Sequence, residues 1–110
     1  MKQLVAVIRP EQLPAVKEEL ARAEFHHLTA ASVMGTAPKT EQRVFRGVRR
    51  EISLFRRVRV ELYIQDAQVE RAIDAISKGC MNSGGFGKIF VNEVADVVKI
   101  WTGERGSRAL

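Results

Sequence analysis

The sequence runs twice through the same order of segments: a strand-like run, a stretch of helical periodicity and a second strand-like run. The strand-like runs are rich in Val and Ile or alternate apolar and polar residues, and the helical stretches place apolar residues three and four positions apart. The predicted elements are strands at 2–9, 28–34, 58–64 and 88–92 and helices at 11–23 and 66–79. Two such halves predict an α+β, ferredoxin-like split βαβ sandwich, with both helices on one face of a four-stranded sheet.

The ends of the second helix and the C-terminal segment carry their own signals. Asp66 is typical of a helix N-cap, and Lys78-Gly79 is typical of a helix C-terminus. Val97 to Thr102 is β-prone, which predicts one further β segment within a C-terminal segment of about 97–110. Residues 1–110 are too few for two cores and are interpreted as a single domain. The sheet face without helices predicts oligomerisation, which would bury it.

Composition limits the class of protein. Apolar content of 45% with 28% charged residues is typical of a globular chain rather than a disordered one. No apolar run reaches the roughly 18–20 residues that span a bilayer, and the N-terminus lacks a signal-peptide pattern. The single Cys80 cannot form an internal disulfide, which suits a reducing compartment. We therefore expect a cytoplasmic protein without a transmembrane segment, and its net charge of +5 favours an anionic partner.

Periodicity fails between residues 36 and 56. A stretch of about 20 residues without secondary structure is uncommon inside a compact domain and is generally functional or disordered. Its only acidic residues are Glu41 and Glu51. Its basic candidates for contact with a partner are Lys39, Arg43, Arg46, Arg49 and Arg50. We interpret the segment as an arm that docks on another protein, with a solvated loop as the alternative.

A glycine-rich loop is predicted at about 81–88, directly before the last predicted strand. Glycine reaches positive φ without a steric penalty, so its backbone N–H groups can approach a ligand closely. Lys88, at the exit of the loop, adds a mobile positive charge. Gly85, Gly87 and Lys88 are therefore candidates for an anion cradle, most plainly for the phosphates of a nucleotide. A plain turn before a buried strand is the alternative.

The reactive residue types argue against an enzyme. His26-His27 has no Cys or carboxylate nearby at a ligand spacing, so no metal site is predicted. The sequence offers no Ser-His-Asp or Cys-His arrangement, and Cys80 has only Lys78 nearby to activate it.

Several short motifs, taken in order and spacing over nearly the whole chain, resemble the PII signal-transduction (nitrogen regulatory P-II) family. The matching stretches are Ile8-Arg9-Pro10, Thr29, Gly35, Arg46-Gly47, Gly87-Lys88-Ile89-Phe90-Val91 and Thr102-Gly103-Glu104. They are similar, in that order, to the family's opening strand, its strand-2 threonine, the glycine that opens its long T-loop, the Arg-Gly pair of that loop, the exit of its B-loop and its C-terminal signature.

This resemblance implies a homotrimer that binds an adenine nucleotide in clefts between subunits, ATP or ADP with AMP as a further candidate. The T-loop, about 36–56, would change shape with the ligand and dock on an ammonium channel, another transporter or a metabolic enzyme. The nucleotide-binding residues it implies are Val7, Thr29, Gly35, Glu61, Tyr63, Gly85, Gly87, Lys88, Lys99 and Trp101, with Lys99 supplied by the neighbouring subunit. Arg9 and Arg57 are candidates for holding a carboxylate effector.

Other positions depart from the family pattern. The T-loop tyrosine that some members carry as a modification site is Arg50 here, so it cannot be uridylylated. Pro38-Lys39 stands where a glutamine helps the family hold magnesium and 2-oxoglutarate, which argues against that metal-centred chelate. Phe86 and Trp101 replace charged residues. Each lost charge-assisted hydrogen bond is worth about 1.5–3 kcal/mol, so a triphosphate should lose more affinity than a diphosphate or monophosphate.

Two alternative functions follow from the same residues. A divergent PII-like trimer would sense ADP or AMP, with or without bicarbonate, in carbon metabolism. An RNA-binding module of the same topology would use residues 85–90, which are similar to the RNP1 pattern. However, Gly84 and Lys88 stand where that pattern needs a basic residue and a second aromatic one, so nucleic acid is not the expected partner.

Overall fold

The computed structural model describes residues 1–36, 43–45, 48–50 and 54–110, with the backbone alone for 43–45 and 48–50. The strands are β1 (Lys2–Ile8), β2 (Thr29–Gly35), β3 (Arg43–Phe45), β4 (Val48–Arg50), β5 (Phe55–Ile64) and β6 (Lys88–Glu93). The α-helices are α1 (Leu13–Arg22) and α2 (Val69–Met81), and short 3-10 helices cover Pro10–Gln12, Asp66–Gln68 and Gly106–Ala109.

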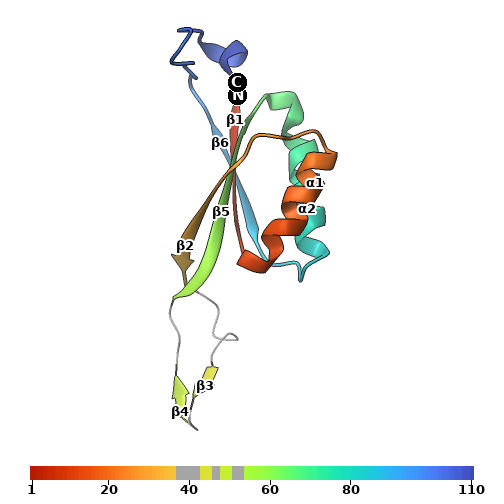
Figure 1. Ribbon diagram of the computed structural model, residues 1–110, viewed down its shortest axis with the longest axis vertical. Coiled ribbons are helices and arrows are strands. Elements are labelled where there is room, and N and C mark those ends of the chain that lie inside the picture. Colours follow the sequence, from red (N-terminus) through yellow and green to blue (C-terminus); the bar gives the residue numbers. More distant parts are fainter. Residues whose placement is uncertain (37–42, 46–47, 51–53) are drawn as a thin grey trace.

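The four long strands form one antiparallel sheet in the order β2-β5-β1-β6. Both α-helices lie side by side on one face of this sheet (Figure 1). This is the predicted α+β, ferredoxin-like arrangement, so the predicted fold class is confirmed. Neither helix of the described chain is long and apolar enough to cross a membrane.

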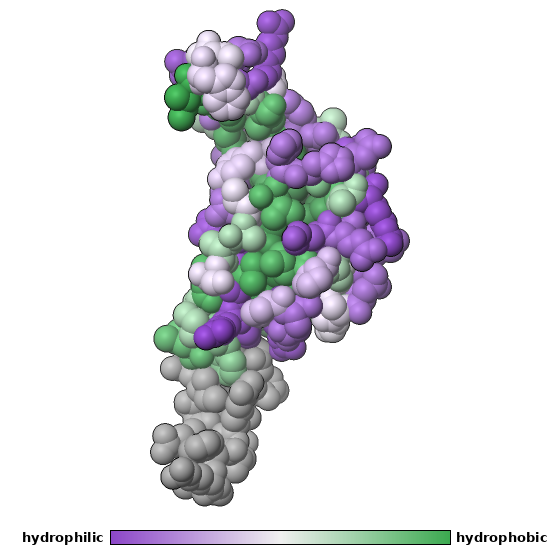
Figure 2. Space-filling model, viewed as in Figure 1, coloured by the Kyte–Doolittle hydropathy of each residue, from purple (hydrophilic) through white to green (hydrophobic). Residues whose placement is uncertain are grey.

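The core lies between the sheet and the helices because alternate strand residues point to the same face. Leu4, Ala6 and Ile8 of β1 are fully or almost fully buried there. Leu20 of α1 and Ile76 of α2 close over them. In the space-filling view, hydrophobic side chains gather between sheet and helices, while hydrophilic ones cover the outer side of the helices (Figure 2).

Gly79 lies where α2 comes very close to α1 and does not end α2, so the predicted helix end is wrong. A Cβ atom at Gly79 would lie 2.7 Å from the Cα atom and 2.9 Å from the backbone nitrogen of Val16 in α1. Real Cβ atoms essentially never come this close to a backbone. The glycine is therefore selected by packing, and α2 continues to Met81.

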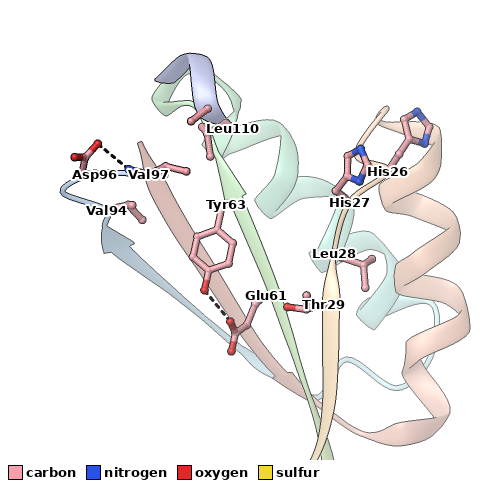
Figure 3. Close-up of a pocket in the computed structure, with 11 residues that line it drawn as sticks. His26, His27, Leu28, Thr29, Glu61, Tyr63, Val94, Asp96, Val97 and Leu110 are labelled. Carbon is pink, nitrogen blue, oxygen red and sulfur yellow. Dashed lines mark hydrogen bonds between the residues drawn. The ribbon is translucent and has the colours of Figure 1, made fainter. Parts of the chain in front are cut away.

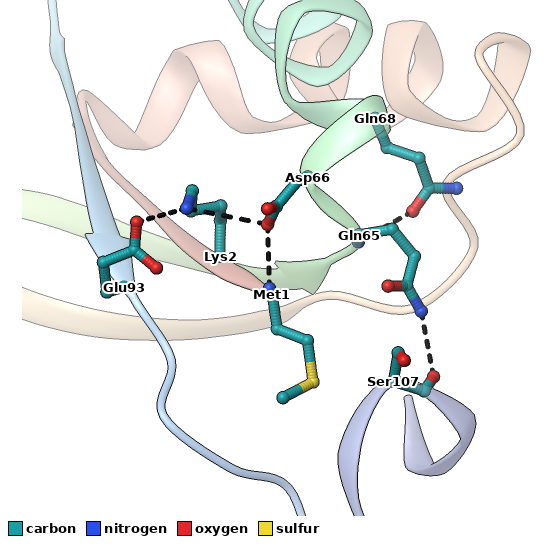
Figure 4. A network of polar contacts seen from close by, with 7 residues as sticks. All are labelled: Met1, Lys2, Gln65, Asp66, Gln68, Glu93 and Ser107. Carbon is teal, nitrogen blue, oxygen red and sulfur yellow. Dashed lines mark hydrogen bonds and ion pairs between the residues drawn. The ribbon is translucent and has the colours of Figure 1, made fainter.

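Asp66 does not cap a helix, so the predicted N-cap is also wrong. Its carboxylate accepts a hydrogen bond of 2.8 Å from the N-terminal ammonium group, which lowers its pKa, and Lys2 Nζ lies 3.6 Å away (Figure 4). Lys2 also pairs with Glu93, which raises the pKa of the lysine. The turn into α2 is closed instead by Gln68, whose Oε1 accepts from the backbone N–H of Gln65 at 3.1 Å.

The long loop is shorter than predicted and contains secondary structure. Phe55 and Arg56 belong to β5, where Phe55 pairs with Gly35, so the loop joins these two residues. Within it, β3 and β4 pair as an antiparallel hairpin, because Val and Phe at 44, 45 and 48 are β-prone despite the surrounding arginines. The prediction of a loop without periodicity is therefore corrected.

The predicted C-terminal β segment is absent: residues 97–102, all of which the structure describes, form no strand. A single bridge joins Val98 to Arg105, and the chain turns between them, with Gly103 at a φ of 75°. The predicted glycine loop is also shorter, because Met81 is the last residue of α2 and Lys88 the first of β6.

Candidate functional site

A pocket with a volume of about 670 Å³ lies on the β2 side of the sheet (Figure 3). Three of the predicted nucleotide-binding residues, Thr29, Glu61 and Tyr63, line it. Thr29 and Glu61 are register partners on β2 and β5. The other lining residues are His26, His27, Leu28, Val94, Asp96, Val97, Ala109 and Leu110. We call Thr29, Glu61 and Tyr63 the pocket group.

A chain of polar contacts crosses the sheet face opposite the helices. Asn92 Nδ2 donates to Gln3 Oε1 at 3.2 Å, and Gln3 Nε2 donates to the Tyr63 hydroxyl at 3.2 Å. Tyr63 donates in turn to Glu61 Oε2 at 3.0 Å, a contact visible in Figure 3. Arg59 Nε lies 2.8 Å from the other oxygen of Glu61. The Glu61 carboxylate is thus held in place from two sides.

The glycine-rich loop has the backbone conformation that its composition predicts. Gly84, Gly85 and Gly87 have φ values of 103°, 73° and 137°. Gly87 also packs closely, since a Cβ atom there would lie 3.1 Å from Ile8 Cγ2 and 3.2 Å from the carbonyl oxygen of Val7. Lys88 follows as the register partner of Val7 and is exposed.

Arg9 and Arg57 meet on an aromatic residue of this loop. The guanidinium carbons of Arg9 and Arg57 lie 4.5 and 4.7 Å from the centre of the Phe86 ring, within the range of cation–π attraction. Arg57 is only 5% exposed, and its Cγ lies 3.5 Å from where a Cβ atom of Gly35 would be. Gly35, Arg9, Arg57 and residues 85–88 therefore belong to one region, which with Val7 we call the glycine-loop group.

Lys99 and Trp101 lie in the C-terminal segment, beyond the opposite end of β6 from the glycine loop. Lys99 Nζ is 5.6 Å from the centre of the Trp101 ring and 3.8 Å from Glu104 Oε1. Trp101 is 82% exposed and Ile100 is 92% exposed. The segment therefore presents an aromatic and an aliphatic side chain outward.

Asp96 fixes the path of this segment. Its carboxylate accepts hydrogen bonds from the Arg105 side chain and from the backbone N–H groups of Val97 at 2.9 Å and Gly106 at 3.1 Å. The bond from Arg105 is the main reason that the pKa of Asp96 is lowered, and the bond from Val97 adds to it.

Because the pKa is lowered in the folded chain, these contacts stabilise the segment above the usual Asp range, and the stabilisation is lost as pH falls through the lowered pKa. In an NMR titration, the amide signals of Val97 and Gly106 should move together with a midpoint below the usual Asp pKa of about 3.9. In Asp96→Asn these signals should not titrate with that midpoint. A midpoint at or above the usual value in the natural chain would contradict the role of Arg105.

The predicted nucleotide-binding residues are thus divided between two places in one chain. The pocket group lies where β2 begins and β5 ends, beside the C-terminal segment. The glycine-loop group lies toward the other end of the sheet, where β1 and β2 end and β5 and β6 begin. The pocket group and residues 85–88 line separate pockets.

Some residues of interest were not predicted, and some predicted residues lie outside the description. Sequence patterns marked Phe86 as a departure from the family and as part of the RNP1-like stretch, but not as a neighbour of Arg57, because periodicity does not report a contact between a loop and a strand. His26, His27 and Asp96 line the pocket without having been assigned to it. Of the arm candidates, Lys39 and Arg46 lie outside the described residues, and Arg43, Arg49 and Arg50 are described by backbone alone. No group of metal-binding side chains occurs in the described part.

Comparison with known proteins gives one consistent result. A family model described as nitrogen regulatory protein P-II matches residues 1–104. The chain is 38% identical to nitrogen regulatory protein GlnK1 of Methanosarcina mazei, covering 100% of this chain and 97% of that protein. It is 37% identical to nitrogen regulatory protein P-II of Rhodospirillum rubrum, covering 100% of both. It is also 37% identical to nitrogen regulatory protein P-II 2 of Methanothermobacter thermautotrophicus, covering 100% of this chain and 97% of that protein.

Proposed function

Since the chain belongs to the nitrogen regulatory protein P-II family, we propose that it is a homotrimeric regulator of nitrogen metabolism that senses ATP or ADP. The nucleotide binds in clefts between subunits, and the loop between Gly35 and Phe55 carries the signal to a target protein, such as an ammonium channel, another transporter or a metabolic enzyme. The protein works in the cytoplasm and acts by binding rather than by catalysis. Burial raises the pKa of the Cys80 thiol, which supports this view because a protonated thiol is a poor nucleophile.

The division of the candidate residues into two groups is the observation that carries this proposal. Within one chain the two groups lie toward opposite ends of the sheet and line separate pockets. Two chains can bring both groups to one nucleotide, if the pocket group and C-terminal segment of one face the glycine-loop group of the next. The sheet face that no described helix covers, with Tyr63 and Phe90 about half exposed on it, offers the surface for such an association.

The glycine-loop group supplies the anion-binding part of this site. The three glycines of its loop have positive φ, and Lys88 stands at its exit as an exposed positive charge. The N–H of Gly85 already donates to the Cys80 carbonyl oxygen at 2.6 Å, so it is not counted among the donors to a phosphate. Arg9 and Arg57 lie beside it and are suited to a carboxylate effector. Phe86 and Trp101 supply no charge, which favours fewer phosphates and keeps sensing of ADP or AMP, with or without bicarbonate, as the second candidate function.

Calorimetric titration of the purified protein with ATP, ADP and AMP tests the proposal. Each titration is run alone, with magnesium and 2-oxoglutarate, and with bicarbonate. ATP or ADP binding at one site per chain in a trimer supports the proposal. A preference for ADP or AMP that ignores 2-oxoglutarate supports the second candidate, and failure of every nucleotide to bind rejects both.

Replacing Lys88 with alanine should weaken nucleotide binding without dissociating the protein. A charge-assisted hydrogen bond is worth about 1.5–3 kcal/mol, so affinity should fall by roughly tenfold or more. Calorimetry gives the affinity, and light scattering after size-exclusion chromatography gives the assembly state. Lys17→Ala, which removes an exposed lysine of α1, is the matched control. Equal affinities for both variants would mean that Lys88 is only a solvated strand residue.

A further inference from the structure

We propose that Phe86 couples the glycine loop to the root of the long loop, through the side chain of Arg57. The inference rests on the proposed function, because it states how nucleotide bound at the glycine loop changes the structure where the long loop leaves the sheet. The root is the register pair of Gly35, the last residue of β2, and Phe55, the first residue of β5.

Arg57 is the shared neighbour of both regions. Its guanidinium carbon lies 4.7 Å from the Phe86 ring centre and 5.3 Å from the Phe55 ring centre. Its Cγ lies 3.5 Å from the position of a Cβ atom on Gly35, and its Nη1 donates to the Arg56 carbonyl oxygen at 2.9 Å. One side chain thus contacts the glycine loop and both strands of the root.

Burial makes Arg57 depend on its contacts within the protein. Arg57 is 5% exposed, so its charged group is largely removed from water, and the aromatic faces replace part of its hydration. Stacking also orients a planar guanidinium, which leaves its in-plane N–H groups pointing in fixed directions. If Phe86 moves, Arg57 loses one of its attractive contacts, and the balance shifts toward its other partners, among them the Phe55 ring and the Arg56 carbonyl oxygen.

Phe86 lies inside the proposed phosphate-binding loop. It stands between Gly85 and Gly87, whose φ values of 73° and 137° set the course of the backbone that carries its ring. Adjustment of these glycines around a phosphate therefore moves the ring. The guanidinium carbon of Arg9 lies 4.5 Å from the ring centre, which holds the ring near the end of β1. A displacement of the ring therefore changes its contact with Arg57.

Hydrogen exchange at the root, measured with and without saturating ADP or ATP, tests the coupling in three variants. Phe86→Leu removes the aromatic face, Phe86→Tyr keeps it, and Phe25→Leu is the matched control. Phe25 also carries a cation–π contact, with the Arg71 guanidinium 4.9 Å from its ring centre, but it packs in the core away from the root. Exchange is followed in peptides that cover residues 33–35 and 55–57, and calorimetry reports nucleotide affinity in the same samples.

In the natural chain and in Phe86→Tyr, nucleotide should change exchange at the root by a factor of about five or more, the usual lower size of an allosteric coupling. In Phe86→Leu the root should exchange faster before nucleotide is added, and nucleotide should no longer change it. Phe25→Leu should respond as the natural chain does.

Three results would overturn the coupling. The first is a full nucleotide response at the root in Phe86→Leu. The second is equal exchange of natural chain and Phe86→Leu without nucleotide, a comparison that holds even if the variant binds no nucleotide. The third is no response at the root of a natural chain that calorimetry shows to be saturated. If the natural chain binds no nucleotide at all, the proposed function itself fails, and the coupling fails with it.

Discussion

Replacing Gly79 with alanine is expected to lower the free energy of unfolding by roughly 2–3 kcal/mol, although alanine is the better helix former. The added Cβ atom would lie 2.7 Å from Val16 Cα, and neither backbone can yield without moving its helix. The helices must separate, and the contacts of Leu20 and Ile76 with the sheet loosen with them. For a chain of this length the melting temperature should fall by about 10 °C or more, as followed by circular dichroism.

Asp74→Ala is the control for this experiment. Asp74 is an exposed residue of the same helix, so the variant reports the gain from alanine without the clash. It should be neutral or slightly stabilising. If Gly79→Ala were as stable as Asp74→Ala, the close helix crossing would not exist in solution.

Replacing Gly87 with alanine is expected to remove most nucleotide binding. The residue has a φ of 137°, where a side chain costs of order 1–3 kcal/mol. A Cβ atom would also press on the Val7 carbonyl oxygen and Ile8 Cγ2. Relief of both strains turns the loop backbone, so the N–H groups of the cradle lose their alignment. Calorimetry should show an affinity at least about tenfold lower, equivalent to 1.4 kcal/mol.

Gly84→Ala separates backbone strain from close contact. Gly84 has a φ of 103°, but a Cβ atom there would meet nothing within 4 Å. This variant should therefore lose less affinity and less thermal stability than Gly87→Ala. Equal losses would show that conformation alone, and not the packing against β1, holds the loop in place.

The sequence predicts the four sheet strands and both helices because each carries a strong period along its own length. Prediction from the sequence fails where the role of a residue depends on a contact with a residue far away in the chain. Asp66 has the chemistry of an N-cap, yet the N-terminal ammonium group, 65 positions away, takes its carboxylate. Gly79 has the chemistry of a helix end, yet the backbone of Val16 explains it. Neither partner is visible in a local pattern.

The predicted C-terminal β segment is wrong for a related reason, and the spatial arrangement of the candidate site residues could not be predicted for the same one. Val97 to Thr102 is β-prone, but Asp96 and Gly103 turn the chain before a ladder can form, and only the Val98–Arg105 bridge remains. The resemblance to a family indicated the candidate residues, and the positions of the glycines predicted an anion cradle. Their division between two ends of the sheet follows from strand pairing and direction, which local propensity does not report.

The polar chain from Asn92 through Gln3 and Tyr63 to Glu61 has a consequence for how the open face of the sheet can be covered. Its donors and acceptors satisfy one another within the chain, next to the half-exposed side chain of Phe90. A partner that covers this face therefore meets polar groups that are already paired, and it need not supply their hydrogen bonds. Burial of the neighbouring aromatic surface remains as the gain from contact.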